Sequence, residues 1–332
     1  MDDMEARMKD FENEKLIHSV YQYFKTRGMP HYSYAYKEKI IEFHKIKNSD
    51  YENGIIDNQV LQKFHGIGLA WSYFPHHWEV QVGKMKRPID IYNDEVLLKK
   101  AIASRIKWGG KVGENGFMTD ANLRKAIRTA SGVQAVSNFR PHAAASIYHK
   151  YANNGVVWDM SCGYGGRLFG ALACGLKKYI GTEPAEKTFD GLNQIKKDFD
   201  FTNTQVELHK IGAEDFIPRE EVDLCFTSPP YFDTEQYSNE ESQSYLRYPT
   251  KNEWLNGFYK SMINNCYQAL KNDGYLIINI ANVKTYEELE EDTFNKTIKN
   301  GFKHITTHQL RLSSISKGGF KYEPVFVFKK EK

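Results

Sequence analysis

Residues 221–232 read Glu-Val-Asp-Leu-Cys-Phe-Thr-Ser-Pro-Pro-Tyr-Phe, which predicts a short buried strand followed by a rigid, extended tip. Each proline fixes its own φ and keeps the residue before it extended. The hydroxyl of Ser228, the carbonyl of Pro229 and the ring of Tyr231 are therefore held together just past a strand end, where open α/β sheets bind ligands. Two oxygen acceptors beside an aromatic ring suit a flat ring that carries an amino group. A plain Pro-Pro turn after a strand is the alternative interpretation.

The chain around this tip alternates strands and helices, which predicts a mainly parallel α/β sheet from about residue 138 onward. The expected strands cover residues 155–160, 178–183, 204–210, 222–227, 274–281, 302–312 and 321–329. The last two are expected to form an antiparallel hairpin that closes the sheet. The expected helices cover residues 142–152, 167–174, 185–199, 252–272 and 285–299.

Residues 1–137 show no such alternation and are predicted to form a mostly helical accessory region. Residues 1–20 have the spacing of an amphipathic helix. Residues 21–36 interleave five tyrosines with Lys25 and Arg27, a pattern that is typical of nucleic-acid binding. A tyrosine-rich packing surface explains the same pattern equally well.

Basic residues recur through the rest of this region. Residues 119–137 superficially suggest a helix-turn-helix, and the alternative is simply a basic helix that stops near Gly132. Other positive side chains make the region locally basic; they are Lys84, Lys86, Arg87, Lys100, Arg105, Lys107 and Lys111. A polyanionic partner is therefore permitted for residues 1–137, although the net charge of +3 for the whole chain does not require one.

The first predicted strand of the sheet ends in a glycine loop, Asp159-Met-Ser-Cys-Gly-Tyr-Gly-Gly-Arg167, which leads into a helix. Glycines let the backbone turn tightly and approach a ligand, and the helix amino terminus offers free N–H groups. Glu183 ends the next strand, where an acid can grip ribose hydroxyls, and Glu214-Asp215 follows the third, where an acid suits an adenine amino group. A nicotinamide dinucleotide site is the competing interpretation, but it leaves the Ser-Pro-Pro-Tyr tip unexplained.

With these motifs in place, the sequence resembles the S-adenosylmethionine-dependent amino-methyltransferases of DNA over residues 138–332. The resemblance implies a Rossmann-like class I methyltransferase domain, whose mainly parallel seven-stranded sheet ends in a C-terminal antiparallel hairpin. It implies S-adenosylmethionine as the cofactor. The cofactor-binding residues that it implies are Phe139, Arg140, Asp159, Ser161, Gly163, Gly165, Gly166, Glu183, Glu214, Asp215 and Thr227.

The same resemblance implies that a DNA base flips out of the duplex and lies against the tip. The catalytic residues that it implies are Ser228, Pro229, Pro230 and Tyr231. The Ser228 hydroxyl and the Pro229 carbonyl would hold the exocyclic amine, favour a pyramidal nitrogen and stabilise charge as it develops. The rest of the catalysis would be alignment of that amine with the sulfonium methyl group.

The chain also departs from the family pattern. Met160 and Ser161 stand where Pro-Phe or a similar pair is common. Serine before Pro-Pro favours N4 of cytosine modestly over N6 of adenine. Methylation at carbon 5 would need a cysteine nucleophile, and Cys225 is expected inside a strand, in the core.

Composition places the chain among soluble globular proteins, with 41% apolar and 26% charged residues. The four cysteines lack paired spacing and no histidine cluster completes a metal pattern, so no metal is expected. Unpaired thiols favour an intracellular, cytoplasmic protein. The apolar run at residues 275–281 is too short to span a membrane, and the acidic N-terminus does not resemble a signal peptide.

The predicted function is therefore methyl transfer from S-adenosylmethionine to the exocyclic amine of a flipped DNA base. The alternatives are an RNA or other amine methyltransferase on the same fold, and a non-catalytic binding subunit. Target recognition is expected in residues 1–137, in the polar loop 232–250, or in a second subunit, either a homodimer mate or another partner. That loop would be an active-site lid or a surface excursion. Restriction-modification with a nuclease partner is one setting for this activity.

Overall fold

The computed structural model describes residues 3–108, 118–314 and 319–331. Its contacts divide the chain into two compact units, of which the first comprises residues 1–33 and 75–136, and the second residues 34–74 and 137–332. The sequence assigns residues 34–74 to the accessory region, whereas they pack within the second unit. Helix α2 (Tyr36–Lys47) explains this, because the ring of Phe43 lies 5.0 Å from that of Phe199 and 6.4 Å from that of Phe169.

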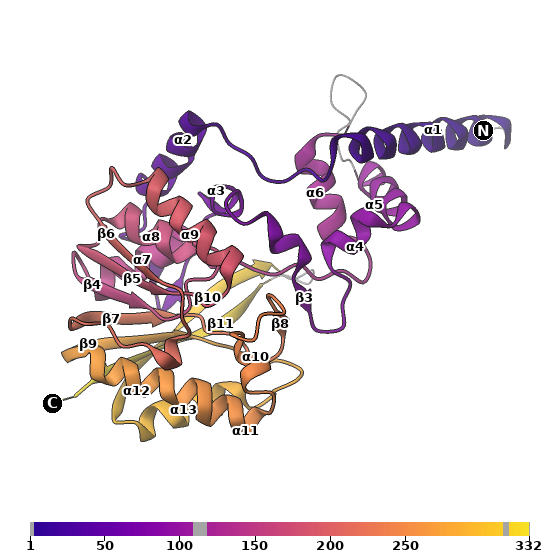
Figure 1. Cartoon of the computed structure of the whole chain (residues 1–332). Coiled ribbons are helices and arrows are strands. Elements are labelled where there is room, and N and C mark those ends of the chain that lie inside the picture. The colour runs from indigo at the N-terminus through magenta and orange to yellow at the C-terminus, as the bar shows by residue number, and fades with distance from the viewer. Residues whose placement is uncertain (1–2, 109–117, 315–318, 332) are drawn as a thin grey trace. The chain divides into compact units, whose positions relative to one another are not determined.

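The second unit is built on one mixed sheet (Figure 1). In spatial order its strands are β1 (Ile55–Ile56), β2 (Gln59–Val60), β10 (Phe302–Ser314), β11 (Phe320–Lys330), β9 (Leu270–Asn279), β7 (Val222–Thr227), β4 (Val156–Asp159), β5 (Lys178–Thr182) and β6 (Gln205–His209). Neighbours from β6 to β9 pair in parallel, and β11 is antiparallel to both β9 and β10. The strand order reverses at β4, so the sheet has its topological switch point beside β7.

The Rossmann-like class I methyltransferase fold that the sequence implies is confirmed, since seven of these strands are the seven expected ones. Two details differ. Strand β9 begins at Leu270, four residues before the expected start. The hairpin of β1 and β2 was not expected; Asp57 and Asn58 form its turn with φ of 48° and 62°, and β2 lies parallel to β10.

Helices cover both faces of the sheet (Figure 1). One face carries α2, α7 (Pro141–Tyr151), α8 (Gly166–Cys174) and α9 (Glu186–Asp198), with the short α3 (Ile67–Trp71) nearby. The other carries α11 (Lys251–Glu253), a π-helical segment (Trp254–Tyr259), α12 (Lys260–Ala269) and α13 (Leu289–Lys299). Large buried side chains from this second group pack on the sheet, among them Trp254, Met262 and Ile263 against Trp158 and Leu276.

The first unit is helical, as expected, and has its own core. It contains α1 (Asp3–Arg27), a 3-10 turn (Pro75–Glu79), β3 (Gln81–Val82), α4 (Pro88–Asn93), α5 (Glu95–Lys107) and α6 (Asp120–Arg128). Its buried side chains include Phe24, Trp78, Leu98, Ile102, Leu123 and Ile127. Lys111, which the sequence counts among the basic residues of this region, lies outside the described residues.

The structure bears on two expectations for the first unit. Helix α6 ends at Arg128, and the next helix along the chain is α7 in the second unit, so no helix-turn-helix forms and the basic-helix interpretation is confirmed. The rings of Tyr21 and Tyr32 lie under the cations of Lys99, at 5.0 Å, and Arg124, at 4.2 Å, of the same unit. These two rings therefore pack inside the unit, and the nucleic-acid interpretation of residues 21–36 stays a prediction. Within the described residues, no helix combines the length and the apolar character that a membrane crossing requires.

Candidate active site

Four loops meet at one edge of the sheet, because β4, β5, β6 and β7 are parallel neighbours and all end there. These loops cover residues 160–165, 183–185, 210–215 and 228–232. The glycine loop, the two acidic positions and the Ser-Pro-Pro-Tyr tip, which are far apart in the sequence, are thus brought to the same edge.

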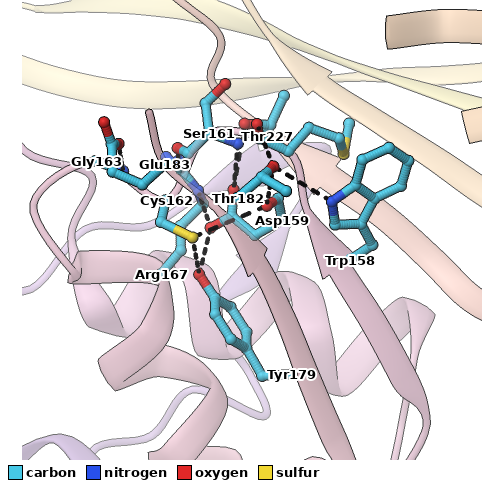
Figure 2. Close-up of polar contacts among 11 residues, drawn as sticks. Trp158, Asp159, Ser161, Cys162, Gly163, Arg167, Tyr179, Thr182, Glu183 and Thr227 are labelled. Carbon is cyan, nitrogen blue, oxygen red and sulfur yellow. Dashed lines mark hydrogen bonds and ion pairs between the residues drawn. The ribbon is translucent and has the colours of Figure 1, made fainter. Parts of the chain in front are cut away.

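Asp159 ends β4, and its fully buried carboxylate holds this edge together (Figure 2). Its Oδ2 accepts from Nε of Arg167 at 2.8 Å and from the Tyr179 hydroxyl at 2.7 Å. Its Oδ1 accepts from the Thr227 hydroxyl and from the backbone N–H of Ser161, both at 3.2 Å. The sequence suggests that Asp159 and Thr227 contact a cofactor directly. In this structure both side chains are fully buried and bonded to protein groups, so they position loop 160–165 instead.

The glycine loop turns in a conformation that favours glycine. Gly163 and Gly165 have φ of 54° and 69°, in the left-handed region. Between them and β4, Cys162 points its sulfur down onto β5, where a Cβ on Gly181 would lie only 2.3 Å from it (Figure 2). Burial raises the pKa of the Cys162 thiol well above its usual value. The loop is therefore anchored on β5 by a buried, unreactive thiol.

The segment before α7, which contains the implied cofactor-binding residues Phe139 and Arg140, packs against the glycine loop. Asn138 donates from Nδ2 to the carbonyl oxygen of Tyr164 at 2.9 Å. A Cβ on Gly166 would lie 1.8 Å from the carbonyl oxygen of Phe139, so only glycine allows this approach. The ring of Phe139 lies 5.4 Å from that of Phe226, in an edge-to-face arrangement. Phe139 therefore reaches the site through its backbone.

Arg140, by contrast, contacts a different segment of the second unit. Its guanidinium lies 3.9 Å from the ring of Phe64, and Nη1 donates to the carbonyl oxygen of Gln62 at 3.5 Å. Burial lowers the pKa of Arg140. The structure thus gives Arg140 a cation–π contact with residues that the sequence did not link to it.

Glu183 follows β5 and turns back toward the glycine loop. Its Oε2 accepts from the backbone N–H of Gly163 at 3.1 Å, and Oε1 accepts from that of Ala185 at 3.0 Å. Burial raises the pKa of this carboxyl to about 7, and the two backbone donors oppose the shift. Each oxygen keeps a lone pair beyond its present bond, so the carboxylate can still accept from neighbouring hydroxyls of a ligand.

The structure separates the two acids that follow β6. Glu214 folds back over Gly212, where an added Cβ would lie 2.3 Å from its Oε2. Its Oε1 accepts from Nη1 of Arg247 at 2.7 Å, while Oε2 is buried and has no hydrogen-bond partner among the described residues. Asp215 is exposed and accepts from the same Arg247 nitrogen at 2.6 Å. Burial raises the pKa of Glu214. Glu214 is therefore the inward acid, with a free acceptor atom.

Arg247 comes from the polar loop 232–250, which contains β8 (Glu235–Gln236) and α10 (Ser244–Arg247). Gln243 and Ser244 are buried, so this part of the loop packs on the second unit rather than extending into solvent. Through Arg247 the loop reaches the acids beside the glycine loop. That contact favours the lid interpretation of the loop over a surface excursion.

The Ser-Pro-Pro-Tyr tip follows β7 and brings its polar atoms together. Ser228 donates from Oγ to the Tyr231 hydroxyl at 3.4 Å. The Tyr231 hydroxyl lies 3.3 Å from Oε2 of Glu323 and 3.4 Å from the carbonyl oxygen of Asn279. Its position is therefore fixed by β9 and β11. Pro229 is buried and Pro230 half-buried, in keeping with a rigid tip.

Several residues of this site were not found from the sequence. Arg167 and Tyr179 form the buried network, Arg247 holds the two acids, and Glu235 and Glu323 bring carboxylates toward Tyr231. The sequence offers a signal for two of them. Arg167 is the last residue of the glycine loop as the sequence defines it, and Glu323 interrupts the last apolar strand just before its proline.

Residues 222–332 match the N6_N4_Mtase family model, described as DNA methylase, and this segment begins at β7 and includes the tip. The chain is similar in structure to a methyltransferase from Pyrococcus furiosus, at 14% identity over 69% of this chain and 98% of that chain with a TM-score of 0.41. It is also similar to an rRNA methylase from Streptococcus thermophilus, at 16% identity over 60% and 100% of the two chains with a TM-score of 0.38.

A third similar structure is the magnesium protoporphyrin IX methyltransferase of Synechocystis PCC 6803 with bound SAM, at 14% identity, with 60% of this chain and 87% of that chain covered and a TM-score of 0.37. These structural likenesses are distant. No curated protein matches this chain in sequence. The family resemblance drawn from the sequence is confirmed for residues 222–332.

Proposed function

We propose, because residues 222–332 match the DNA methylase family model, that this chain transfers a methyl group from S-adenosylmethionine to the exocyclic amine of a base in DNA. The observation that carries the proposal is the position of the Ser-Pro-Pro-Tyr tip. It lies inside the matched segment, and β7 brings it to the sheet edge that also bears the glycine loop and its acids. Acceptors for an amine and a cradle for a nucleotide thus share one edge.

Four residues at this edge would hold S-adenosylmethionine. The turn through Gly163 and Gly165 allows the cofactor to approach the backbone, and Glu183 would accept from its ribose hydroxyls. The unpartnered Oε2 of Glu214 would accept from the adenine amino group, because a buried acceptor without a donor is costly and a ligand N–H relieves that cost. When bound, the cofactor supplies a methyl group on a sulfonium sulfur.

The tip would hold the base. An exocyclic amine is a poor nucleophile, because its lone pair is delocalised into the ring. The Ser228 hydroxyl and the Pro229 carbonyl would accept its hydrogens and favour a pyramidal nitrogen. Removing the base from the duplex costs a few kcal/mol. Stacking on Tyr231 returns about 1–3 kcal/mol of that. Serine before Pro-Pro favours N4 of cytosine over N6 of adenine.

Mass spectrometry of nucleosides tests the proposal directly. DNA and RNA from cells that express the chain are compared with those from cells that express Ser228→Ala, which removes one acceptor. We expect N4-methylcytosine or N6-methyladenine in DNA only with the unchanged chain. A new modified base in RNA alone would mean that RNA, rather than DNA, is the substrate. No new base in either nucleic acid, with purified chain and added cofactor also inactive, would refute the proposal.

Alanine in place of Glu214 is expected to weaken S-adenosylmethionine binding by about 10- to 100-fold, since hydrogen bonds to charged groups contribute about 1.5–3 kcal/mol. Asp215→Ala is the matched control, because Arg247 keeps one carboxylate partner in each variant. We expect less than a threefold change for the control in isothermal titration calorimetry. Equal losses in the two variants would contradict the assignment of Glu214 as the inward acceptor.

Cofactor affinity is expected to rise by about tenfold between pH 6 and pH 8. The pKa of Glu183 is raised to about 7, so the carboxyl is mostly protonated at pH 6 and mostly ionised at pH 8. Only the ionised form leaves both oxygens free to accept from ribose hydroxyls, so binding favours deprotonation. Calorimetric titrations across this range check the slope. Glu183→Gln should bind the cofactor weakly at every pH. If this variant keeps the dependence of affinity on pH, that dependence belongs to another group.

We also infer that the first unit contacts the DNA backbone. This unit holds sixteen Lys and Arg against twelve Asp and Glu, and the second holds 29 against 30, so the positive charge of the chain lies in the first. Lys84 and Lys86 are exposed on a loop that is pinned beside the end of α6, because the backbone N–H of Lys86 donates to the carbonyl of Gly132 at 2.8 Å. In the described part of the chain, neither lysine forms an ion pair.

Charge reversal at both positions, Lys84→Glu with Lys86→Glu, is expected to weaken binding of a DNA duplex by at least about tenfold at 0.1 M salt. The slope of log affinity against log salt should fall by about two, one for each lost phosphate contact. Fluorescence anisotropy at several salt concentrations measures both. The control is Lys196→Glu with Lys197→Glu on α9, which changes the net charge equally. Equal losses for the two pairs would assign the effect to net charge rather than to this loop.

A further inference from the structure

Methyl transfer to an amine leaves a proton to be removed. The attacking nitrogen becomes a cation once it has bonded to the methyl carbon, and it regains neutrality only when it loses a hydrogen. The Ser228 hydroxyl can accept that hydrogen only if it passes its own onward, because a neutral hydroxyl is a weak base. A site that uses serine in this way therefore needs another group, connected to the serine by hydrogen bonds, that can keep the proton.

The structure has a chain of hydrogen bonds that starts at this hydroxyl. Ser228 donates from Oγ to the Tyr231 hydroxyl at 3.4 Å, and the Tyr231 hydroxyl lies within donating distance of Oε2 of Glu323, at 3.3 Å, and of the carbonyl oxygen of Asn279, at 3.4 Å. Asn279 holds the far end, since its Nδ2 lies 3.4 Å from the same Oε2 and donates to the carbonyl of Pro324 at 3.0 Å. The first two bonds run in the direction that moves a proton from Ser228 toward Glu323. The bond from Asn279 supports the Glu323 end of this path.

The sheet itself places Glu323 at this point. Val325 pairs with Asn279, the last residue of β9, so β11 continues past the end of β9 and carries Glu323 over the edge where the tip lies. A Tyr231 ring that only stacked on a base would need no hydroxyl. Here the hydroxyl joins the tip to a carboxylate that belongs to a strand about ninety residues later in the sequence.

We propose that Glu323 is the terminal proton acceptor of the methyl transfer, reached from the substrate amine through Ser228 and Tyr231. The nitrogen bonds to the methyl carbon as the carbon–sulfur bond breaks and its electron pair stays on sulfur. One amine proton moves to Oγ of Ser228, the serine proton moves to Tyr231, and the tyrosine proton moves to Glu323. The products are a neutral methylated amine, a neutral thioether and a protonated Glu323. The inference rests on the proposed function.

The surroundings of Glu323 suit this role. Burial raises the pKa of its carboxyl, and the negative charge of Glu290 adds to the shift, while Asn279 and Tyr231 oppose it. Burial also raises the pKa of the neighbouring Glu235, and the charge of Glu323 adds to that shift. Within the described residues, no cation forms an ion pair with Glu323, so nothing there holds the carboxylate ionised. A carboxylate in such surroundings accepts a proton more readily than one in water.

Single-turnover methylation at saturating S-adenosylmethionine and DNA tests the relay. Glu323→Gln and Tyr231→Phe each break one link, and the phenylalanine keeps the ring for stacking. We expect each to slow the reaction by about 100-fold, with the double variant no slower than the single ones, because both act on one path. Glu323→Asp should recover part of the rate. Glu331→Gln, just beyond the same strand and exposed, is the matched control and should match the unchanged chain.

Two further readouts separate proton acceptance from a merely structural role. The rate of the unchanged chain should rise with pH until Glu323 is ionised and then level off, and Glu323→Gln should lose that rise. NMR of protein with ¹³C-labelled glutamate, without substrate, should show several carboxyls whose pKa is raised, and one of these signals should disappear in Glu323→Gln and shift in Tyr231→Phe. Affinities for cofactor and DNA should stay within about twofold.

The relay is wrong if the Glu323→Gln and Tyr231→Phe effects multiply, if Glu323→Gln keeps the rise with pH, or if that variant loses affinity without losing rate. These outcomes leave the proposed function intact, because the unchanged chain still methylates DNA in them. A chain that methylates no DNA under any condition would refute the proposed function, and the relay with it. A shift of the Glu323 signal in Tyr231→Phe would then report only a structural contact between the two side chains.

Discussion

Methionine in place of Arg167 is expected to destabilise the second unit by about 3–5 kcal/mol, because it leaves the carboxylate of Asp159 buried without its cation. The two side chains are 5% and 0% exposed and lie 2.8 Å apart, so solvent cannot replace the lost partner. Arg167 also donates to the carbonyl of Ser161, which adds a lost bond to the loop. Urea unfolding followed by circular dichroism measures the change.

The exposed Arg219 provides the matched control, since Arg219→Met removes the same charge at the surface and should change stability by less than about 0.5 kcal/mol. Combining Asp159→Asn with Arg167→Met should cost less than the sum of the two single changes, since it removes both charges together. A loss of under about 1 kcal/mol for Arg167→Met would mean that water or another cation reaches Asp159 and that the network does not hold the edge.

Alanine in place of Gly166 is expected to abolish measurable cofactor binding, a loss of at least about 100-fold, and to destabilise the second unit by about 1–3 kcal/mol. The new methyl group would stand 1.8 Å from the carbonyl oxygen of Phe139 and 2.7 Å from Oδ1 of Asn138. The first of these atoms belongs to the backbone, so no rotamer change relieves the overlap. Either the glycine loop or the segment before α7 must move. Calorimetry and urea unfolding report the two effects.

Gly175→Ala at the other end of α8 serves as the control. Gly175 has φ of 71°, but a Cβ there would meet nothing within 4 Å. Backbone strain alone should cost about 1 kcal/mol and leave cofactor affinity unchanged. If Gly166→Ala bound the cofactor as well as Gly175→Ala does, the close approach of Phe139 to α8 would not matter for the site.

The strands of the sheet and the positions of the glycine loop, Glu183 and the tip could be predicted, because each depends on a local signal. A run of apolar residues bounded by glycine or proline marks a strand, and the carboxyl ends of parallel strands must share an edge. The end of the helix expected over residues 252–272 is wrong, because α12 ends at Ala269. Asp273 adopts φ of 66° and β9 is already paired at Leu270, a pairing that no local pattern announces.

The roles within the site depend on burial, which the sequence does not contain. Glu214 and Asp215 are neighbours of the same chemical type, and only the turn over Gly212 makes one inward and the other exposed. Asp159 belongs to the glycine motif, yet its four donors come from Arg167, Tyr179, Thr227 and Ser161. Glu323 needed the register of β11 against β9 before it could be placed beside Tyr231. Long-range pairing decides each of these.

The buried thiol of Cys162 can report motion of the glycine loop through its rate of chemical labelling. A thiol that is sealed against β5 reacts with an alkylating reagent only in the fraction of molecules whose loop has lifted away. Its labelling rate therefore reports the free energy of that local opening, without any probe being introduced. A ligand that closes over the loop should slow the labelling as it fills the site, so the modification of Cys162, measured separately from that of the half-buried Cys174, would follow binding.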